Sequence, residues 1–279
     1  MHREAFPLRV FTPDPPLRLV ASAREIWVFR ELLWQLATRE VRVRYKQTVL
    51  GAAWAILQPF SMMVVFTVFF GRLAQLPNDG APYPLFYFSA LVPWSYFAGS
   101  LSAATNSLTN EAGLLTKIYF PRAVVPVASL LAASLDFAIA TLILGGMLAF
   151  YRVAPAVTWG LLPVFLMIQV VFTLGAGFLL SALNVTYRDV RYAIPLLLQL
   201  WLYATPIVYP FSLVPAGFRF WYVLVNPMAI LIDGYRGALL RGASPDPLLL
   251  ALAVIVSVAG CVAAYAYFRR AEREFADII

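Results

Sequence analysis

The chain has 279 residues, of which 62% are hydrophobic and 13% are charged, and its mean hydropathy is +0.78. A soluble globular domain is closer to half apolar and a quarter charged, so this composition excludes an ordinary soluble protein. The apolar residues gather in runs long enough to cross a bilayer core, which takes roughly 20 residues. The sequence therefore predicts a polytopic membrane protein, and the net charge of +7 reports on topology more than on nucleic-acid binding.

Several kinds of chemistry lack the residues that they need. The only histidine is His2, which removes histidine-based acid–base catalysis and a histidine-ligated metal site. The only cysteine, Cys261, excludes a disulfide framework and is expected to be a small packing residue. No G-x-x-x-x-G-K-[ST] loop is present to cradle a nucleotide. We expect no enzyme, no metal and no cofactor on this chain, so ATP-driven work would need a separate ATPase.

The N-terminal region is expected to stay on the cytoplasmic side. Residues 1–25 carry scattered charges and prolines and predict a flexible cytoplasmic arm. Residues 26–50 predict an amphipathic helix that lies in the membrane interface, with a solvated surface helix as the alternative. The helix has an apolar face and a separate basic face, made respectively by Phe29, Leu32, Leu33 and Leu36 and by Arg39, Arg42 and Lys46.

Six membrane spans are expected within residues 51–270, before a cytoplasmic tail at 271–279. The spans lie near residues 52–70, 83–105, 123–150, 159–183, 193–210 and 247–268. Most of the 21 Lys and Arg residues then fall on the side of the two termini. The positive-inside rule therefore predicts that both termini are cytoplasmic.

The segment 206–240 is apolar but is interrupted by Pro210, Pro215 and the Asn226–Pro227 pair. These breaks leave pieces too short for a span, which favours two short re-entrant helices between spans five and six. A seventh span would place the arginines of the C-terminal tail outside, against the charge rule. Irregular backbone at membrane depth is tolerated only inside protein or beside water, so something polar, or a channel, is implied nearby.

Three stretches in order carry a family resemblance. "VRYKQTVLGAAWAILQP" (43–59), "GLLTKIYFPRAVVPVAS" (113–129) and "YRDVRYAIPLLLQLWLYATPIVYP" (187–210) together resemble the membrane (permease) subunit of type 2 ABC exporters of polysaccharides. The likeness runs from about residue 28 to residue 270. That family exports lipid-linked O-antigen, capsular polysaccharide and teichoic acid.

The resemblance implies an inner-membrane homodimer with a channel between its two copies. It also implies two copies of a separate ABC ATPase, which carries ATP and Mg²⁺, and outward movement of a polyprenyl-diphosphate-linked O-antigen or capsule-like glycan. Teichoic acid, or another lipid or drug, is the alternative cargo within the same architecture. A membrane enzyme acting on lipid-linked sugar and a passive channel are the alternatives outside it.

The resemblance also places an ATPase-coupling helix in the inner loop at 107–122, where Asn110 is a candidate helix cap. An ordinary loop helix on the membrane surface is the alternative. The residues expected to contact the ATPase are Asn110, Glu111, Leu114, Leu115, Lys117, Arg188 and Asp189. Arg188, Asp189 and Arg191 are equally compatible with an anchor for span five at headgroup level.

A sugar channel would use aromatic rings, which pack on the C–H faces of sugars, together with a few polar groups. In span five, Tyr192, Leu196, Gln199 and Tyr203 share a helical stripe, whereas Trp201 points almost opposite to Gln199. In span two, Tyr83, Tyr87, Trp94 and Phe97 share another stripe. The predicted channel-lining residues are Tyr87, Trp94, Phe97, Tyr192, Gln199 and Tyr203; aromatic belts and helix contacts are the alternatives.

Charged residues suggest three further roles. The basic side chains expected to meet the lipid diphosphate or anionic headgroups are Arg39, Arg42, Arg44 and Lys46. Asp136 lies in the interior of span three, where a bare charge is expensive. Packing and a hydrogen bond to a neighbouring helix are favoured over a protonated carboxyl group or a wet cavity. Asp233 and Arg236 are three residues apart and are expected to pair as a re-entrant gate or a structural clip.

Overall fold

The computed structural model describes residues 19–46, 53–115, 120–273 and 275. Within these ranges the chain is helical and no β-strand occurs, which confirms the predicted all-α fold class. Of the predicted arm at 1–25, residues 1–18 lie outside the described part of the chain.

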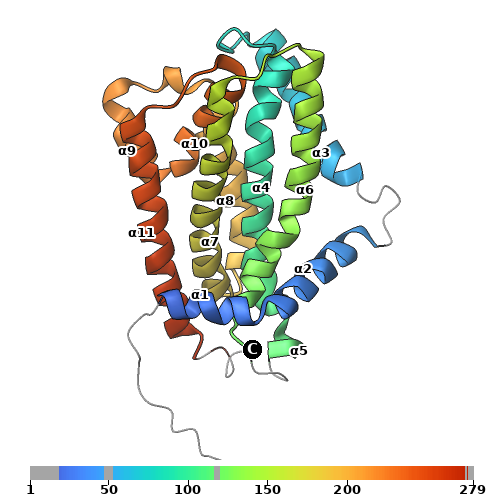
Figure 1. Cartoon of the computed structure of the whole chain (residues 1–279), viewed down its shortest axis with the longest axis vertical. Coiled ribbons are helices and arrows are strands. Elements are labelled where there is room, and N and C mark those ends of the chain that lie inside the picture. Colours follow the sequence, from blue (N-terminus) through green and yellow to red (C-terminus); the bar gives the residue numbers. More distant parts are fainter. Residues whose placement is uncertain (1–18, 47–52, 116–119, 274, 276–279) are drawn as a thin grey trace, which may run out of the picture.

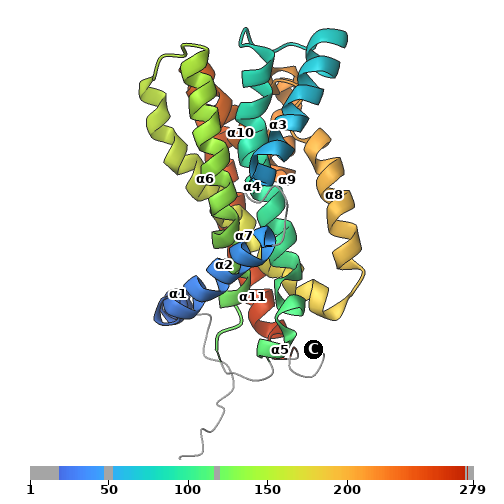
Figure 2. The same ribbon diagram turned by 90° about the vertical axis from the view of Figure 1, so that its right-hand side faces the viewer.

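The body of the molecule is a bundle of long helices that run along its longest axis (Figure 1). They are α3 (Trp54–Phe66) with its π-helical extension η2 (Thr67–Leu73), α4 (Tyr83–Asn110), α6 (Val124–Phe150), α7 (Leu162–Thr186), α8 (Val190–Ala204) and α11 (Pro247–Ala271). Helix α4 packs against both α6 and α7, and α7 packs along α11. Helices α6 and α8 lie on opposite sides of the bundle (Figure 2).

Shorter helices occupy the two ends of the bundle. Helices α1 (Leu19–Val28) and α2 (Arg30–Tyr45) cross one end, near α5 (Ala112–Leu115) (Figure 1). The other half carries η4 (Phe211–Leu213), α9 (Ala216–Val225), α10 (Pro227–Arg236) and its extension η5 (Gly237–Arg241). A 3₁₀ turn, η3 (Val157–Leu161), leads into α7.

Local sequence signals explain where these helices begin and end. Helix α11 begins at Pro247, and the side chain of Asp246 accepts hydrogen bonds from the backbone N–H groups of Leu248 and Leu249. Helix α8 ends at Ala204, and Thr205 is extended because it precedes Pro206. The helix therefore ends before Pro206 and is shorter than the predicted range 193–210.

Four helical segments in the described part of the chain are long and apolar enough to cross a membrane. They are Ile56–Leu73, Val124–Phe150, Val157–Thr186 and Pro247–Ala271. A fifth results if the pair Ala216–Val225 and Pro227–Arg241, bent by 111°, is one broken span; the same bend fits the predicted re-entrant helices. The chain is thus a multi-pass membrane protein, whereas the predicted count of six depends on the less apolar α4 and the 15-residue α8.

Buried polar side chains connect the long helices. The Gln169 amide of α7 donates to the carbonyl of Pro93 in α4 at 2.7 Å and accepts from the Tyr235 hydroxyl of α10 at 3.1 Å. Nearer the other end, the Asn184 amide of α7 donates to the carbonyl of Thr105 in α4 at 2.9 Å. Because a buried polar group is costly without a partner, these bonds fix how α4, α7 and α10 sit against one another.

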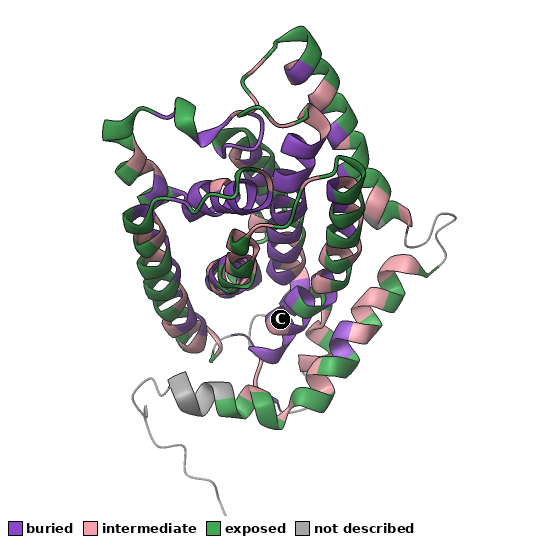
Figure 3. Cartoon of the chain, turned by 45° about the horizontal axis from the view of Figure 1, so that its top comes forward, coloured by how far each residue is buried: buried purple, intermediate pink, exposed green. Residues whose placement is uncertain are grey.

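The predicted apolar face of α2 packs on the bundle. Leu36 is buried and Phe29, Leu32 and Leu33 are half-buried against the lower ends of α6, α7 and α11. The opposite side of α1 and α2 exposes large apolar side chains, including Trp27 and Trp34. Figure 3 shows the same division, with buried residues where helices face one another and exposed residues on the outward faces. Placement of this helix in the membrane interface stays a prediction.

Candidate functional site

Helix α8 exposes the polar and aromatic stripe that its sequence predicts. Tyr192 is 75% exposed and Tyr203 49%, and Gln199 is also exposed on this helix. The buried side of α8 is formed by Ile194, Leu198 and Leu202. The exposed stripe is therefore available to a second protein chain, to lipid or to a channel.

Trp201 projects from α8 toward the bundle, away from Gln199. Its ring lies 5.1 Å from the ring of Phe97 and 6.5 Å from that of Trp94, and it also meets Phe172 of α7 at 6.1 Å. This aromatic cluster attaches α8 to α4 and α7, and it accounts for the position that the helical period predicts for Trp201.

The predicted channel residues of span two lie inside the protomer. Tyr87 and Phe97 expose 0% of their surface and Trp94 exposes 3%. The ring of Tyr87 packs against Phe66 and Tyr83, and its hydroxyl has no hydrogen-bond partner among the described residues. Tyr87 and Phe97 are thus enclosed in this conformation, whereas Trp94 lines a cavity between α2, α3, α4 and α6.

Asp136 is bound by two residues from the end of α2. Arg44 Nη1 donates to Asp136 Oδ2 at 2.5 Å, and the Tyr45 hydroxyl donates to Asp136 Oδ1. Arg44 Nη2 also lies 3.5 Å from Glu40, whose other carboxylate oxygen accepts from Ser129 at 2.9 Å. Asp136 therefore has the interhelical hydrogen-bonding role that we favoured.

The environment of Tyr45 keeps its hydroxyl protonated. Desolvation by burial, followed by the hydrogen bond and the charge of Asp136, raises the pKa of Tyr45 to about 12. Tyr45 therefore remains a hydrogen-bond donor to the carboxylate at neutral pH.

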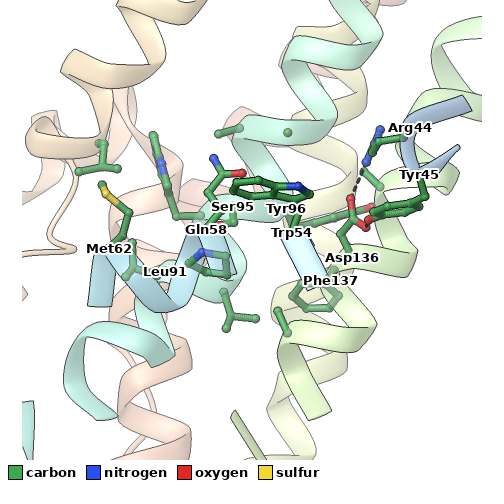
Figure 4. Close-up of a pocket in the computed structure, with 18 residues that line it drawn as sticks. Arg44, Tyr45, Trp54, Gln58, Met62, Leu91, Ser95, Tyr96, Asp136 and Phe137 are labelled. Atoms are coloured by element: carbon green, nitrogen blue, oxygen red, sulfur yellow. Dashed lines mark hydrogen bonds and ion pairs between the residues drawn. The ribbon is translucent and has the colours of Figure 1, made fainter. Parts of the chain in front are cut away.

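A cavity of about 480 Å³ opens beside this charged cluster, between the end of α2 and helices α3, α4 and α6 (Figure 4). Arg44, Tyr45 and Asp136 stand at one end of it, and Trp54, Gln58 and Met62 line it from α3. The sequence singled out Arg44 and Asp136 separately and offered a cavity at Asp136 only as an alternative to a hydrogen bond. The two residues are 92 positions apart, and no local pattern signals their contact.

The four predicted headgroup cations have different environments. Arg39 forms an ion pair with Glu111, and Arg44 is paired with Asp136 as above. Arg42 and Lys46 are exposed. Pairing lowers the net charge that Arg39 and Arg44 offer to a phosphate, whereas Arg42 and Lys46 face outward.

Four of the predicted coupling residues, Asn110, Glu111, Leu114 and Leu115, lie in the short helix α5 or directly before it. Asn110 is the last residue of α4, and Glu111 takes the position before α5, so Asn110 is not the cap that we expected. Leu114 and Leu115 are half-buried against the cluster below α6 and α7. Arg188 and Asp189 are exposed at the turn before α8, and Lys117 lies outside the described residues.

The expected pairing of Asp233 with Arg236 is wrong. Asp233 binds Arg241 at 2.7 Å, and Arg241 also binds Asp79 at 2.7 Å. Arg236 turns inward instead and donates to backbone carbonyls, among them that of Pro206 at 2.6 Å. The two side chains leave α10 toward different neighbours, so their spacing of three residues does not bring them together.

A further polar contact joins the inner loop to the end of the chain. The backbone N–H of Arg122 donates to Glu272 Oε1 at 3.0 Å, and the Arg122 guanidinium donates to the Glu272 carbonyl. Arg269 holds the other carboxylate oxygen at 2.9 Å, and Phe275 packs on Phe268 with ring centroids 5.7 Å apart. Sequence reasoning missed this contact and treated residues 271–279 as a tail.

Apolar helices that can cross a membrane, linked by buried polar bonds and carrying an exposed stripe on α8, define a multi-pass helical membrane protein. The model of the ABC-2 type transporter family matches residues 31–240, and the chain belongs to this family. The resemblance predicted from the three sequence motifs is thereby confirmed.

Proteins named for polysaccharide export or transport match most of the chain. It is 32% identical to the O-antigen export system permease protein RfbA of Myxococcus xanthus, over 94% of this chain and 100% of the relative. A protein of the same description from Klebsiella pneumoniae is 30% identical over 89% of this chain and 95% of its own. The polysialic acid transport protein KpsM of Escherichia coli is 22% identical over 74% and 80% of the two chains.

Proposed function

We propose that this chain is the membrane subunit of an ATP-driven exporter that moves a polyprenyl-diphosphate-linked polysaccharide outward across a bacterial inner membrane. Membership of the ABC-2 type transporter family supports the transport role. The relatives named for O-antigen export and polysialic acid transport support a polysaccharide as cargo. In this proposal each subunit has six spans and cytoplasmic termini, and two copies enclose the channel.

The observation that carries the proposal is the exposed stripe of α8. An amide that faced lipid hydrocarbon would lack hydrogen-bond partners, so Gln199 is expected to face water or sugar. Tyr192 and Tyr203 flank it with rings that can pack on the C–H faces of sugar units while their hydroxyls bond to sugar hydroxyls. We place this stripe in the channel wall and leave the enclosed aromatic side chains of α4 out of it.

Cysteine accessibility tests this placement. In a Cys261→Ala background, Gln199→Cys and Tyr203→Cys should react with a water-soluble maleimide in membranes, and Trp201→Cys should not. Trp201 is the matched control because it lies on the same helix and packs into the bundle. Unreactive Gln199→Cys and Tyr203→Cys in an exporter that still restores surface polysaccharide would contradict the proposed channel wall.

The ATPase is proposed to dock around α5, where Leu114 and Leu115 and the exposed Arg188 and Asp189 are the contact candidates. A stable complex of two copies of this chain with two copies of a Walker-motif ATPase should be obtained on co-purification. Leu114→Asp is expected to abolish polysaccharide export while the ATPase alone still hydrolyses ATP. Activity of the isolated chain on a lipid-linked sugar would instead support an enzyme.

The exposed cations Arg42 and Lys46 are the proposed contacts to the lipid diphosphate or to anionic headgroups. Charge reversal at both positions should weaken stimulation of ATP hydrolysis by lipid-linked glycan. Unchanged stimulation in this double variant would remove them from the proposal.

A further inference from the structure

The cavity beside Asp136 is separate from the α8 stripe and is built largely from apolar walls. Its lining includes Met62 of α3, Leu91 of α4 and Ala140 of α6, and α8 contributes Leu202 from its buried side. Its volume of about 480 Å³ falls within the roughly 300–1,000 Å³ that is usual for small-molecule sites.

Helix α4 is shaped to leave this space open. Between Leu85 and Leu101 its residues are buried or half-buried, except for Ser95 and Gly99. These two small residues are four positions apart and therefore share one face, and both line the cavity. A Cβ atom added at Gly99 would meet no other atom within 4 Å.

The cavity adjoins two of the helical segments that can cross a membrane. It is lined by the first half of α3 and the middle of α6, and both helices belong to segments that can cross a membrane. The neighbouring outward side chains of α3, including Leu57 and Phe60, are apolar and exposed. An apolar cavity that opens between two spans is accessible to hydrocarbon chains from the bilayer.

The charges at the polar end select against an anionic occupant. Two carboxylates lie beside one cation: Arg44 is held by Asp136, which lines the cavity, and is approached by Glu40, which does not line it. This arrangement attracts an ammonium group and does not favour a diphosphate, which would have to displace Asp136 from Arg44. The rings of Trp54 and Tyr96 line the same end and can stabilise an ammonium group by cation–π interaction.

We propose that this cavity binds a zwitterionic phospholipid with a primary ammonium group, its acyl chain along Met62, Leu91 and Ala140 and its head beside Asp136. The site is distinct from the path of the glycan and does not depend on the proposed export function. It gives α3 and the end of α2 a lipid contact that holds them against α4 and α6.

Photo-crosslinking in vesicles tests the proposal. The full chain is reconstituted in phosphatidylcholine vesicles with either a phosphatidylethanolamine or an isoprenyl diphosphate, each carrying a diazirine in its hydrocarbon chain. The ethanolamine probe should label peptides of α3, α4 and α6 that line the cavity. Gly99→Leu should lower that labelling by about tenfold, a difference of 1.4 kcal/mol in binding.

Gly145→Leu is the matched control, because Gly145 is an exposed glycine of α6 outside the cavity and also has open space around it. Ser95→Leu fills the cavity from a second position and replaces Gly99→Leu if that variant fails to fold. Labelling of the cavity peptides that neither filling variant reduces would overturn the proposal.

A variant of Asp136 tests the proposed preference of the cavity for an ammonium headgroup. Asp136→Asn leaves Arg44 with more uncompensated positive charge, so labelling by the diphosphate probe should rise relative to labelling by the ethanolamine probe. If the diphosphate probe already labels the wild-type cavity in preference to the ethanolamine probe, the occupant is an anionic lipid and the proposed selectivity is wrong.

Discussion

Arg236 shows how a single buried cation can organise backbone. It is 2% exposed, and its guanidinium donates to the carbonyls of Phe86 at 3.1 Å, Pro206 at 2.6 Å and Tyr209 at 3.2 Å, and also to that of Ile207. The carbonyls from 206 to 209 belong to the irregular segment after α8, where no helix satisfies them. A planar group with five N–H donors suits this task, and a lysine has no equivalent geometry.

Arg236→Met should therefore lower the free energy of unfolding by about 3 kcal/mol or more, because several buried carbonyls lose their donor. Arg236→Lys should recover only part of the loss. The measurement is thermal unfolding in detergent, with the exposed Arg72→Met as control. If Arg236→Met unfolded at the same temperature as the wild type, the guanidinium hydrogen bonds would not be needed for stability.

Tyr45 makes the stability of the α2 contact depend on alkaline pH. Its pKa is raised from 10.0 to about 12, mainly by desolvation, so above pH 10 the unfolded chain loses this proton while the folded chain keeps it. The stability that Tyr45 contributes is complete below pH 10 and falls as the pH rises toward 12. In Tyr45→Phe the free energy of unfolding should fall less between pH 10 and pH 12. Unfolding curves of both proteins from pH 8 to 12 measure this difference. Parallel curves would contradict the assignment.

At the scale of elements, helices α7 and α11 cross closely at Gly175. A Cβ atom at this position would lie 2.7 Å from the Cα of Cys261, a backbone atom that cannot move aside without moving α11. The predicted packing role of Cys261 is consistent with this contact. Small residues at such crossings allow transmembrane helices to approach each other.

Gly175→Ala should lower the free energy of unfolding by about 1–3 kcal/mol, the usual cost of overpacking a tight contact. Gly260→Ala on α11 is the matched control, because nothing lies within 4 Å of its added methyl group. Alanine exceeds glycine in helix propensity by about 0.8–1.0 kcal/mol, so Gly260→Ala should be neutral or stabilising. Thermal unfolding of both variants distinguishes the two effects, and equal shifts would argue against a close crossing.

At the scale of the whole molecule, Glu272 and Phe275, which follow the last span, are part of the packed structure. Phe275 is 1% exposed and lies in the cluster formed by α2, α6, α7 and α11, and Arg122 binds Glu272 beside it. Arg122, which follows the proposed ATPase-coupling loop, is thus bonded to the residue directly after the last span. The sequence predicts only a cytoplasmic tail at 271–279, because this segment follows the last apolar run.

Phe275→Ala should lower the free energy of unfolding by about 3–5 kcal/mol, as is usual for removing a buried phenylalanine. Tyr267→Ala, at a position of α11 that is 40% exposed, should cost much less. A difference in melting temperature between the two variants, measured on the full chain, checks the expectation. Equal melting would place Phe275 outside the packed cluster.

The sequence alone determined the all-α class, the approximate extents of most long helices, the break after α8 and the family of the chain. The helical features depend on hydropathy, helical period and proline, which act over a few residues. The family follows from three sequence motifs that occur in order along the chain. The opposite orientations of Gln199 and Trp201 were also predicted, because both lie on one regular helix.

Only the tertiary structure decided which charges meet and which aromatic side chains are enclosed. Asp136 pairs with Arg44, which is 92 positions away in the sequence. Asp233 forms its ion pair with Arg241 and not with Arg236. Tyr87 and Phe97 are buried. Periodicity states which side of a helix a residue occupies but not which helix lies opposite. The packing of α2, α4 and α6 supplies that information, and with it the cavity beside Asp136.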